Sequence, residues 1–359
     1  MEDGRIAGIA SGTQGDRKVD VLAPGLIDNH NHGGFGCSVM TSGEREYAGW
    51  LEDLARHGVT ATLAGVYTAP MEVMRSAIAV AQRVMAFQQA GIIGGARLLG
   101  VHLEGPFLSR EKPGSGAMDV HELLTPTVEA YDCLVEQTGD VIKEITIAPE
   151  TPGCDSLIAY LKSKGIRMLA GHTNATYDDG QRAFRQGVGA VCHFFNASRG
   201  IHHREPGILA SALLDDRIFC EAICDFVHVH PAALQVLIGM KGRDRVMIIS
   251  DAVTMAGFPD CEYMDGPDHI IQRDGACRLD NGDLAGGAAY VTDGVRKLVS
   301  LGIPLEDALT MASATPAQWL GLTDCGGITE NRRADLTALN DDLSTAFTLV
   351  GGVPYDPAS

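Results

Sequence analysis

The sequence has few basic residues, which argues against a protein that binds nucleic acid. Its 359 residues include 28 Lys and Arg against 46 Asp and Glu, so the formal net charge is −18. A surface that binds a nucleic-acid backbone needs clustered basic side chains, whereas an acidic surface repels the polymer. Small molecules are therefore the expected partners.

Long apolar stretches and leader signals are also missing. No apolar run approaches the roughly 20 residues that a membrane helix needs, and residues 1–5 lack the basic-then-apolar order of a secretory signal. The nine cysteines are scattered, odd in number and without a Cys-x-x-Cys pair, so free thiols are expected. These features predict a cytoplasmic protein with no membrane partner.

Two common catalytic signatures do not occur. The sequence has no Gly-x-Ser-x-Gly nucleophile elbow and no Gly-Lys-Ser/Thr phosphate loop. A serine hydrolase of the elbow type and a P-loop nucleotide hydrolase are therefore not expected.

Apolar runs alternate with helical patterns from residue 20 to about residue 315, which predicts repeated β-α units. Helices are expected at 71–89, 176–186 and 231–240. Eight parallel strands with crossover helices build a TIM-like (β/α)8 barrel of roughly 250 residues. The eight candidate strands are 21–27, 59–63, 98–103, 145–148, 167–170, 190–194, 219–223 and 246–249.

The alternative fold is an open, doubly wound sheet. Its nucleotide-binding form carries Gly-x-Gly-x-x-Gly after the first strand, and residues 33–36 read Gly-Gly-Phe-Gly instead. We therefore predict a barrel of the metal-dependent hydrolase type over residues 21–321. Residues 1–20 and 322–359 are short and β-prone, and we expect them to form a small β-sandwich lobe. Residues 260–287 are expected to form a long excursion or hairpin after the eighth strand.

Histidine and acidic residues stand at the ends of these predicted strands. His30 and His32 are two residues apart, so a strand projects them onto one face. The carboxyl ends of barrel strands meet at one rim, where barrel enzymes have their active sites. His102 either supports such a site from behind or simply packs in the core. The candidate ligands of one metal site are His30, His32, Glu104, His172, His193 and Asp251.

The chemistry of these ligands limits the choice of metal. Imidazole and carboxylate groups without thiolate suit zinc, iron, manganese or cobalt at a catalytic centre, with one position left for water. The sequence therefore predicts a catalytic metal site.

These residues and their neighbours resemble the N-acetylglucosamine-6-phosphate deacetylases of the amidohydrolase superfamily. The resemblance runs over most of the chain. It rests on PGLID at 24–28, HNH at 30–32, HLEGPF at 102–107, GHTNAT at 171–176, HFFNA at 193–197, HREPG at 203–207, residues 225–230 and SDA at 250–252.

The resemblance implies a ligand set. Glu104, His172 and His193 are similar to the ligands of a metal that all members hold. His30 and His32 are similar to the ligands of a second metal that some members bind. One or two divalent ions per subunit are then expected, most readily zinc, with Glu104 as a candidate bridge. Asp251, also a candidate ligand, is implied to act as general base and then as general acid.

The resemblance also implies the substrate contacts. Asn196, the backbone of Ala197, and Arg204 are similar to phosphate and sugar contacts of the family. His228 is similar to a contact that members donate across a dimer interface, so a homodimer is expected. The alternative for Arg204 is a surface ion pair with Glu205.

The implied reaction is hydrolysis of the N-acetyl group of N-acetylglucosamine 6-phosphate, which gives glucosamine 6-phosphate and acetate. Three alternatives stay open: the same reaction on N-acetylgalactosamine 6-phosphate, hydrolysis of another amide such as a cyclic imide or an N-acyl amino acid, and a non-catalytic scaffold. The complete ligand set argues against the scaffold.

Two features depart from the family. Met118 stands where members carry a histidine that polarises the substrate carbonyl, and a thioether cannot donate a hydrogen bond. A second metal, another loop residue or a different substrate would have to compensate. The segment before His30 is also shorter than is usual, so the lobe is expected to lack its first strands and to be smaller or stabilised by a dimer partner.

Overall fold

The computed structural model describes residues 1–9, 17–114, 118–136, 138–266 and 268–357. An eight-stranded parallel sheet lies at its centre, with the strands in chain order. Each predicted apolar run supplies one of these strands, which confirms the predicted (β/α)8 barrel. The strands are β2 (Leu26–Asp28), β5 (Val59–Tyr67), β6 (Arg97–Glu104), β7 (Ile142–Ile147), β8 (Arg167–Ala170), β9 (Ala190–Val191), β10 (Phe219–Ile223) and β11 (Val246–Ile249).

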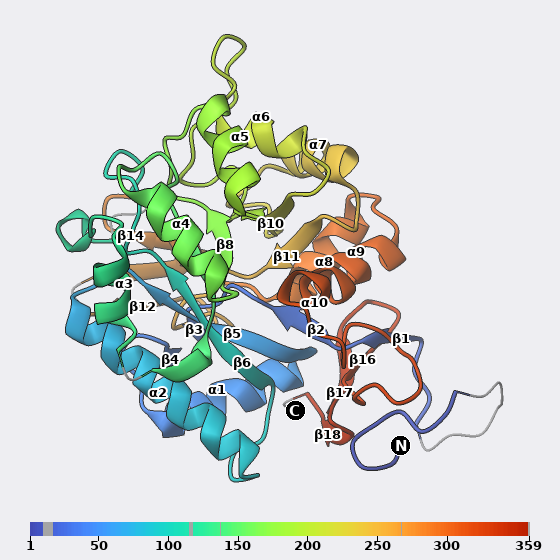
Figure 1. The fold of residues 1–359 in the computed structure, drawn as a ribbon. Coiled ribbons are helices and arrows are strands. Elements are labelled where there is room, and N and C mark those ends of the chain that lie inside the picture. Colours follow the sequence, from blue (N-terminus) through green and yellow to red (C-terminus); the bar gives the residue numbers. More distant parts are fainter. Residues whose placement is uncertain (10–16, 115–117, 137, 267, 358–359) are drawn as a thin grey trace.

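Helices surround the strands (Figure 1). The predicted helix at 71–89 is α2, and the one expected from 176 begins one residue later because Thr176 is its N-cap, in a capping box with Asp179. The helices are α1 (Glu44–Arg56), α2 (Met71–Gln89), α3 (Val128–Leu134), α4 (Cys154–Ser163), α5 (Tyr177–Gln186), α6 (Gly207–Leu213), α7 (Pro231–Lys241), α8 (Val291–Ser300), α9 (Leu305–Ala312) and α10 (Ala314–Leu320), with 3-10 turns η1 (Val120–Glu122) and η2 (Gly139–Val141).

The barrel nearly closes between its first and last strands, β2 and β11. Just beyond the strand ends, the Asp251 N–H donates to the His30 carbonyl at 3.0 Å, and the His32 N–H donates to the Ala252 carbonyl at 2.8 Å. Deeper in the barrel, the Ser250 hydroxyl donates to Asp28 at 2.5 Å. This seam holds two predicted ligands of the first strand beside the predicted ligand of the eighth.

Both ends of the chain contribute to a small β lobe, as predicted, but among the described residues it is a single four-stranded sheet and not the predicted sandwich. β1 (Val21–Pro24) pairs with β16 (Leu336–Leu339), which continues to β17 (Thr345–Val350) and β18 (Val353–Tyr355). The two ends of the chain lie on this side of the molecule (Figure 1). The lobe has an apolar core of its own: Ile6, Ala334, Leu336, Ala338, Phe347 and Leu349.

The predicted strand at 21–27 is in fact two strands in two different sheets. β1 joins the lobe and β2 joins the barrel, so the barrel sheet begins after residue 21. Gly25 separates them, and a Cβ atom there would lie 2.1 Å from the Thr60 hydroxyl. Only glycine therefore fits where the chain passes from one sheet to the other.

The excursion predicted at 260–287 is a second antiparallel sheet. It contains β12 (Cys261–Asp265), β13 (Asp268–Arg273), β14 (Ala276–Leu279) and β15 (Leu284–Gly287). A bridge between Ala252 and Gly287 attaches it to the barrel beside Asp251. A short hairpin of β3 (Gly33–Gly34) and β4 (Cys37–Ser38) follows His32 directly.

All nine cysteines are free thiols, as predicted. Among the described residues, no helix combines the length and the apolar content of a membrane span.

Candidate metal centre

All six predicted ligands lie at the carboxyl-terminal rim of the barrel. Five of them are buried, with exposures of 0 to 6%, and the Asp251 side chain is 15% exposed. Each follows or ends a strand: His30 and His32 after β2, Glu104 in β6, and His172, His193 and Asp251 after β8, β9 and β11. The structure thus brings together side chains from five strands.

Glu104 joins two groups of ligand atoms. In the first group, Glu104 Oε1 lies 2.9 Å from His172 Nε2 and 3.0 Å from His193 Nε2, and these two nitrogens are 3.1 Å apart. Two ligand atoms on a tetrahedral zinc ion are about 3.3 Å apart, given bonds of about 2.0–2.1 Å. The spacing therefore fits one divalent ion held by this group.

The second group contains both histidines of the first strand. Their Nε2 atoms are 3.1 Å apart, and Asp251 Oδ1 lies 3.4 Å from that of His30 and 3.2 Å from that of His32. Glu104 Oε2 reaches within 3.4 Å of His32 Nε2. The two groups share Glu104, so the site fits one or two ions.

Hydrogen bonds at the far side of three imidazoles fix their orientation. His30 Nδ1 donates to Glu221 at 3.1 Å, His32 Nδ1 to the Gly65 carbonyl at 2.8 Å, and His172 Nδ1 to the Lys112 carbonyl at 3.2 Å. A neutral imidazole that donates through Nδ1 has a lone pair on Nε2. When its ring is neutral, each Nε2 presents a lone pair to the ligand atoms of its own group, as a bound cation requires.

Unusual backbone conformations turn three of the ligands inward. His172, His193 and Asp251 have φ values of 45°, 22° and 50°. The left-handed region costs a residue other than glycine roughly 1–2 kcal/mol, and such strain clusters at functional sites. Its presence at three predicted ligands supports a functional site here.

The two carboxylates of the site are ionised. Burial alone would raise the pKa of Glu104, but the charge of His172 and hydrogen bonds from the surrounding imidazoles hold it well below its usual value. For Asp251, burial is outweighed by the hydrogen bond from His32 and the charge of His30, which bring the pKa to about 2. Negative charge is thus fixed among the imidazoles.

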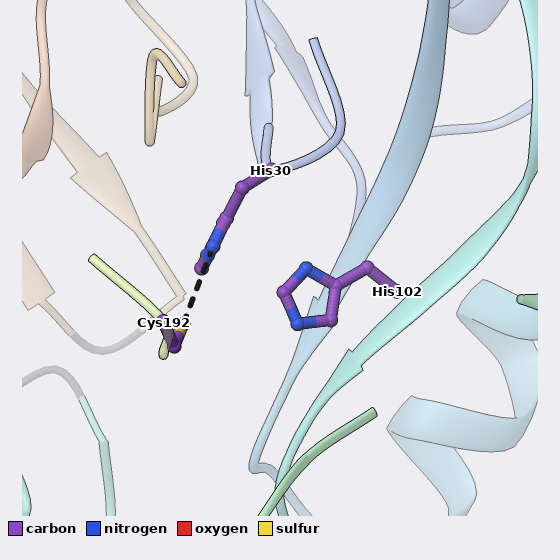
Figure 2. A group of neighbouring side chains, drawn as sticks. All are labelled: His30, His102 and Cys192. Atoms are coloured by element: carbon purple, nitrogen blue, oxygen red, sulfur yellow. Dashed lines mark hydrogen bonds between the residues drawn. The ribbon is translucent and has the colours of Figure 1, made fainter. Parts of the chain in front are cut away.

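A second polar layer lies below the ligands, and Figure 2 shows part of it. Cys192 Sγ lies 3.5 Å from His30 Nδ1, and the His102 ring packs edge-on to the His30 ring at 4.4 Å. Burial raises the pKa of the Cys192 thiol well above its usual range, while burial and the charge of His30 lower the pKa of His102 to about 3. Both groups are neutral, and the contact of His102 with His30 is one of ring packing.

Sequence reasoning missed two glutamates of this layer. Glu221 in β10 accepts hydrogen bonds from His30 and, at 2.5 Å, from Asn29. Glu144 in β7 accepts from Trp319 Nε1 at 2.5 Å. Burial and the charge of Glu221 raise the pKa of Glu144, whereas the charge of His30 outweighs burial and lowers that of Glu221. The sequence did hold a signal for both residues: each is a glutamate within an apolar strand, at a position that faces the barrel interior.

A cavity of about 420 Å³ opens above the ligands. The predicted substrate contacts Asn196, Ala197 and His228 line it, and so does Met118, the residue that departs from the family. Other lining residues were not predicted from the sequence: Tyr67, Lys112, Asp265, Asp268 and Asp283. Its size lies within the range of small-molecule sites.

Two of the predicted substrate contacts lie apart from each other. His228 lines the cavity of its own chain, and its donation across a dimer interface stays a prediction. It follows β10 by five residues, and Asp225 holds its Nδ1 at 2.6 Å. Arg204 lies outside the cavity, on an exposed loop where its guanidinium contacts His203 Nε2 at 2.7 Å. Glu205 accepts from two backbone N–H groups and does not pair with Arg204.

The barrel, the paired histidines after its first strand and the Glu, His and Asp ligands at its rim define a metal-dependent amidohydrolase. The model of the Amidohydrolase family matches residues 21–354. N-acetylglucosamine-6-phosphate deacetylase of Vibrio furnissii is 34% identical over all of this chain and 90% of its own length. N-acetylgalactosamine-6-phosphate deacetylase of Escherichia coli O157:H7 is 33% identical over 91% of this chain and 86% of its own.

Solved structures show the same relationship. N-acetylglucosamine-6-phosphate deacetylase of Thermotoga maritima has a TM-score of 0.89 at 29% identity, covering 100% of this chain and 94% of its own. A mutant N-acetyl-D-glucosamine-6-phosphate deacetylase of Mycobacterium smegmatis, in complex with N-acetyl-D-glucosamine-6-phosphate, has a TM-score of 0.90 at 30% identity. The match covers 99% of this chain and 93% of that one. The chain belongs to the N-acetylglucosamine-6-phosphate deacetylase family.

Proposed function

We propose that this enzyme hydrolyses the N-acetyl group of N-acetylglucosamine 6-phosphate to glucosamine 6-phosphate and acetate. The observation that carries the proposal is the complete pair of ligand groups, joined by Glu104, at the floor of a cavity of about 420 Å³. The names of the relatives and of the liganded structural neighbour support the choice of substrate.

The residues fit one or two divalent ions, and we propose zinc. Glu104, His172 and His193 would hold the first ion, and His30 and His32, with Asp251 beside them, would hold the second. Neutral imidazoles and carboxylates without thiolate are ligands that a catalytic zinc site uses. When bound, zinc polarises the amide carbonyl and makes an attacking water available near neutral pH.

Asp251 is the proposed general base and acid. It is the most exposed of the ligand-type side chains and lines the cavity, and its low pKa leaves it ionised and able to accept a proton. It takes a proton from the attacking water and returns it to the nitrogen of the leaving amine when the carbon–nitrogen bond breaks.

Asn196, Ala197 and His228 are the proposed contacts to the sugar phosphate. The backbone N–H of Ala197 donates to no group within the described part of the chain, and its φ of 46° belongs to a tight turn next to the cavity. Free backbone N–H groups in such turns bind anions. Asp225 fixes the ring of His228 so that Nε2 is left for the ligand.

We also propose a homodimer in which Arg204 serves the neighbouring site. Among the described residues that line the cavity, Lys112 is the only lysine or arginine, which is little positive charge for a phosphate dianion. The loop at 198–206 projects from the molecule beside α6 (Figure 1). Arg204 on this loop is free to enter the cavity of a partner, where its planar guanidinium suits a phosphate.

The test compares deacetylation rates of zinc-reconstituted enzyme on N-acetylglucosamine 6-phosphate, its galactosamine epimer and both unphosphorylated sugars. We expect the glucosamine phosphate to be preferred and Asp251→Asn to lower kcat by roughly 10³-fold or more, at the upper part of the usual range for a general acid–base. A preference for the epimer would select the alternative substrate. Equal rates on unphosphorylated sugars, or near-normal turnover by Asp251→Asn, would contradict the proposal.

A further inference from the structure

Tyr67 places its phenol ring beside His32, one of the candidate ligands, at the wall of the cavity. It is the last residue of β5, and its Cα pairs in register with that of Glu104 in β6. Gly65, two residues earlier, pairs with the buried His102, so the two-residue period of a strand directs Tyr67 toward the barrel interior as well. The Tyr67 ring then packs edge-on to His32, with 5.6 Å between ring centroids, and lines the cavity.

The hydroxyl of Tyr67 is available to a ligand. Within the described part of the chain it makes no hydrogen bond, and Tyr67 is only partly buried. Burial, followed by the charges of Asp265, Asp268 and Glu104, raises the pKa of Tyr67 above its ordinary value. The group therefore stays protonated at any working pH and acts as a neutral donor.

The loop that faces this end of the cavity offers no comparable donor at Met118. That side chain is 8% exposed and packs with Leu108 and Leu123 in a small apolar cluster. Its thioether sulfur only accepts weakly. The backbone carbonyl of Lys112, from the same loop, accepts from His172 Nδ1.

When water adds to an amide, negative charge develops on the carbonyl oxygen. A fixed donor aimed at that oxygen stabilises the transition state more than the substrate. We infer that the Tyr67 hydroxyl donates a hydrogen bond to the acetyl carbonyl oxygen of the bound substrate and stabilises the negative charge that forms there. The phenol keeps its proton throughout. This inference rests on the proposed deacetylase function.

The first test is Tyr67→Phe, which removes one hydroxyl and leaves the ring against His32. We expect kcat to fall about 100-fold, the effect of losing one oxyanion donor, with KM changed less than about two-fold. Zinc content and Tm should equal those of the wild type. Tyr160→Phe is the matched control, because its hydroxyl bonds Asp132 outside the cavity, and it should keep full activity.

The second test is affinity for an analogue whose phosphonamidate group replaces the acetyl amide and presents a tetrahedral oxyanion. In Tyr67→Phe, its Ki should rise by the same factor as kcat/KM falls, because the lost bond belongs to the transition state. If Tyr67 only stabilised the fold, the rise in Ki and the fall in kcat/KM would not follow the same factor.

Three outcomes with an active wild type would overturn the inference alone: an unchanged kcat, a raised KM at constant kcat, or an unchanged Ki for the analogue. Loss of zinc from Tyr67→Phe would also overturn it. A wild type without activity on either sugar phosphate would overturn the proposed function itself, and the inference with it.

Discussion

Replacing Glu221 with glutamine tests how the buried polar layer supports the second ion. Glu221 is fully buried, and its carboxylate accepts the Nδ1 proton of His30 at 3.1 Å and the His193 N–H at 3.3 Å. A glutamine of the same shape keeps a carbonyl oxygen for His30 but removes the negative charge. The His30 ring is then held less firmly in its orientation and is a less basic ligand.

The magnitude follows from the type of hydrogen bond. A bond to a charged group contributes about 1.5–3 kcal/mol and a neutral one about 0.5–1.5 kcal/mol. The difference of about 1.4 kcal/mol corresponds to a tenfold change in the affinity of the His30 and His32 group for zinc. Competition titration with a chromophoric chelator, together with zinc stoichiometry after dialysis, measures it. The ion held by Glu104, His172 and His193 should remain.

Glu144→Gln is the matched control. Glu144 lies in the same layer, where burial and the charge of Glu221 raise its pKa. It accepts from Trp319 Nε1 at 2.5 Å and from Asn29 at 3.3 Å, and it makes no hydrogen bond to His30, so its replacement leaves the contacts of that ring unchanged. Equal zinc affinity in Glu221→Gln and wild type, or equal losses in the two variants, would refute the reasoning.

Two further predictions concern the metal and the dimer. Removing metal with a chelator should abolish turnover and lower Tm, because ions present at 100 times their Kd stabilise the fold by about 2.7 kcal/mol; zinc should restore both, and an unchanged Tm and activity would contradict the metal assignment. Mixed dimers of Arg204→Ala and Asp251→Asn should regain turnover that neither variant has alone, because one of their two sites then combines Asp251 with Arg204 of the partner subunit. No gain on mixing and re-forming the dimers would place the action of Arg204 within its own subunit.

The sequence allowed the barrel and its ligands to be predicted for a simple reason. Parallel strands bring their carboxyl ends to one rim, so a ligand's position at a strand end is enough to place it. Glu104 and His172 are 68 residues apart in the chain and 2.9 Å apart in the structure. The helical pattern between the second and third strands also located α2 to the residue.

Other features depend on contacts that no local pattern records. The break between β1 and β2 follows from the close approach of Gly25 to Thr60, and these two residues lie far apart in the sequence. Arg204 and His228 lie in loops, whose direction is set by neighbours such as Asp225 and not by periodicity. The contacts of Glu221 with His30 and Asn29 join different strands inside the barrel, and no local pattern in the sequence records them.

The seam between β2 and β11 also determines when this metal centre can assemble. His30 and His32 are synthesised early, but Asp251 and the backbone groups that pin the first histidine segment arrive with the last barrel strand. A nascent chain that stops before residue 251 has neither a closed barrel nor a complete ligand set. The group of His30, His32 and Asp251 is therefore complete only after the last barrel strand has been synthesised.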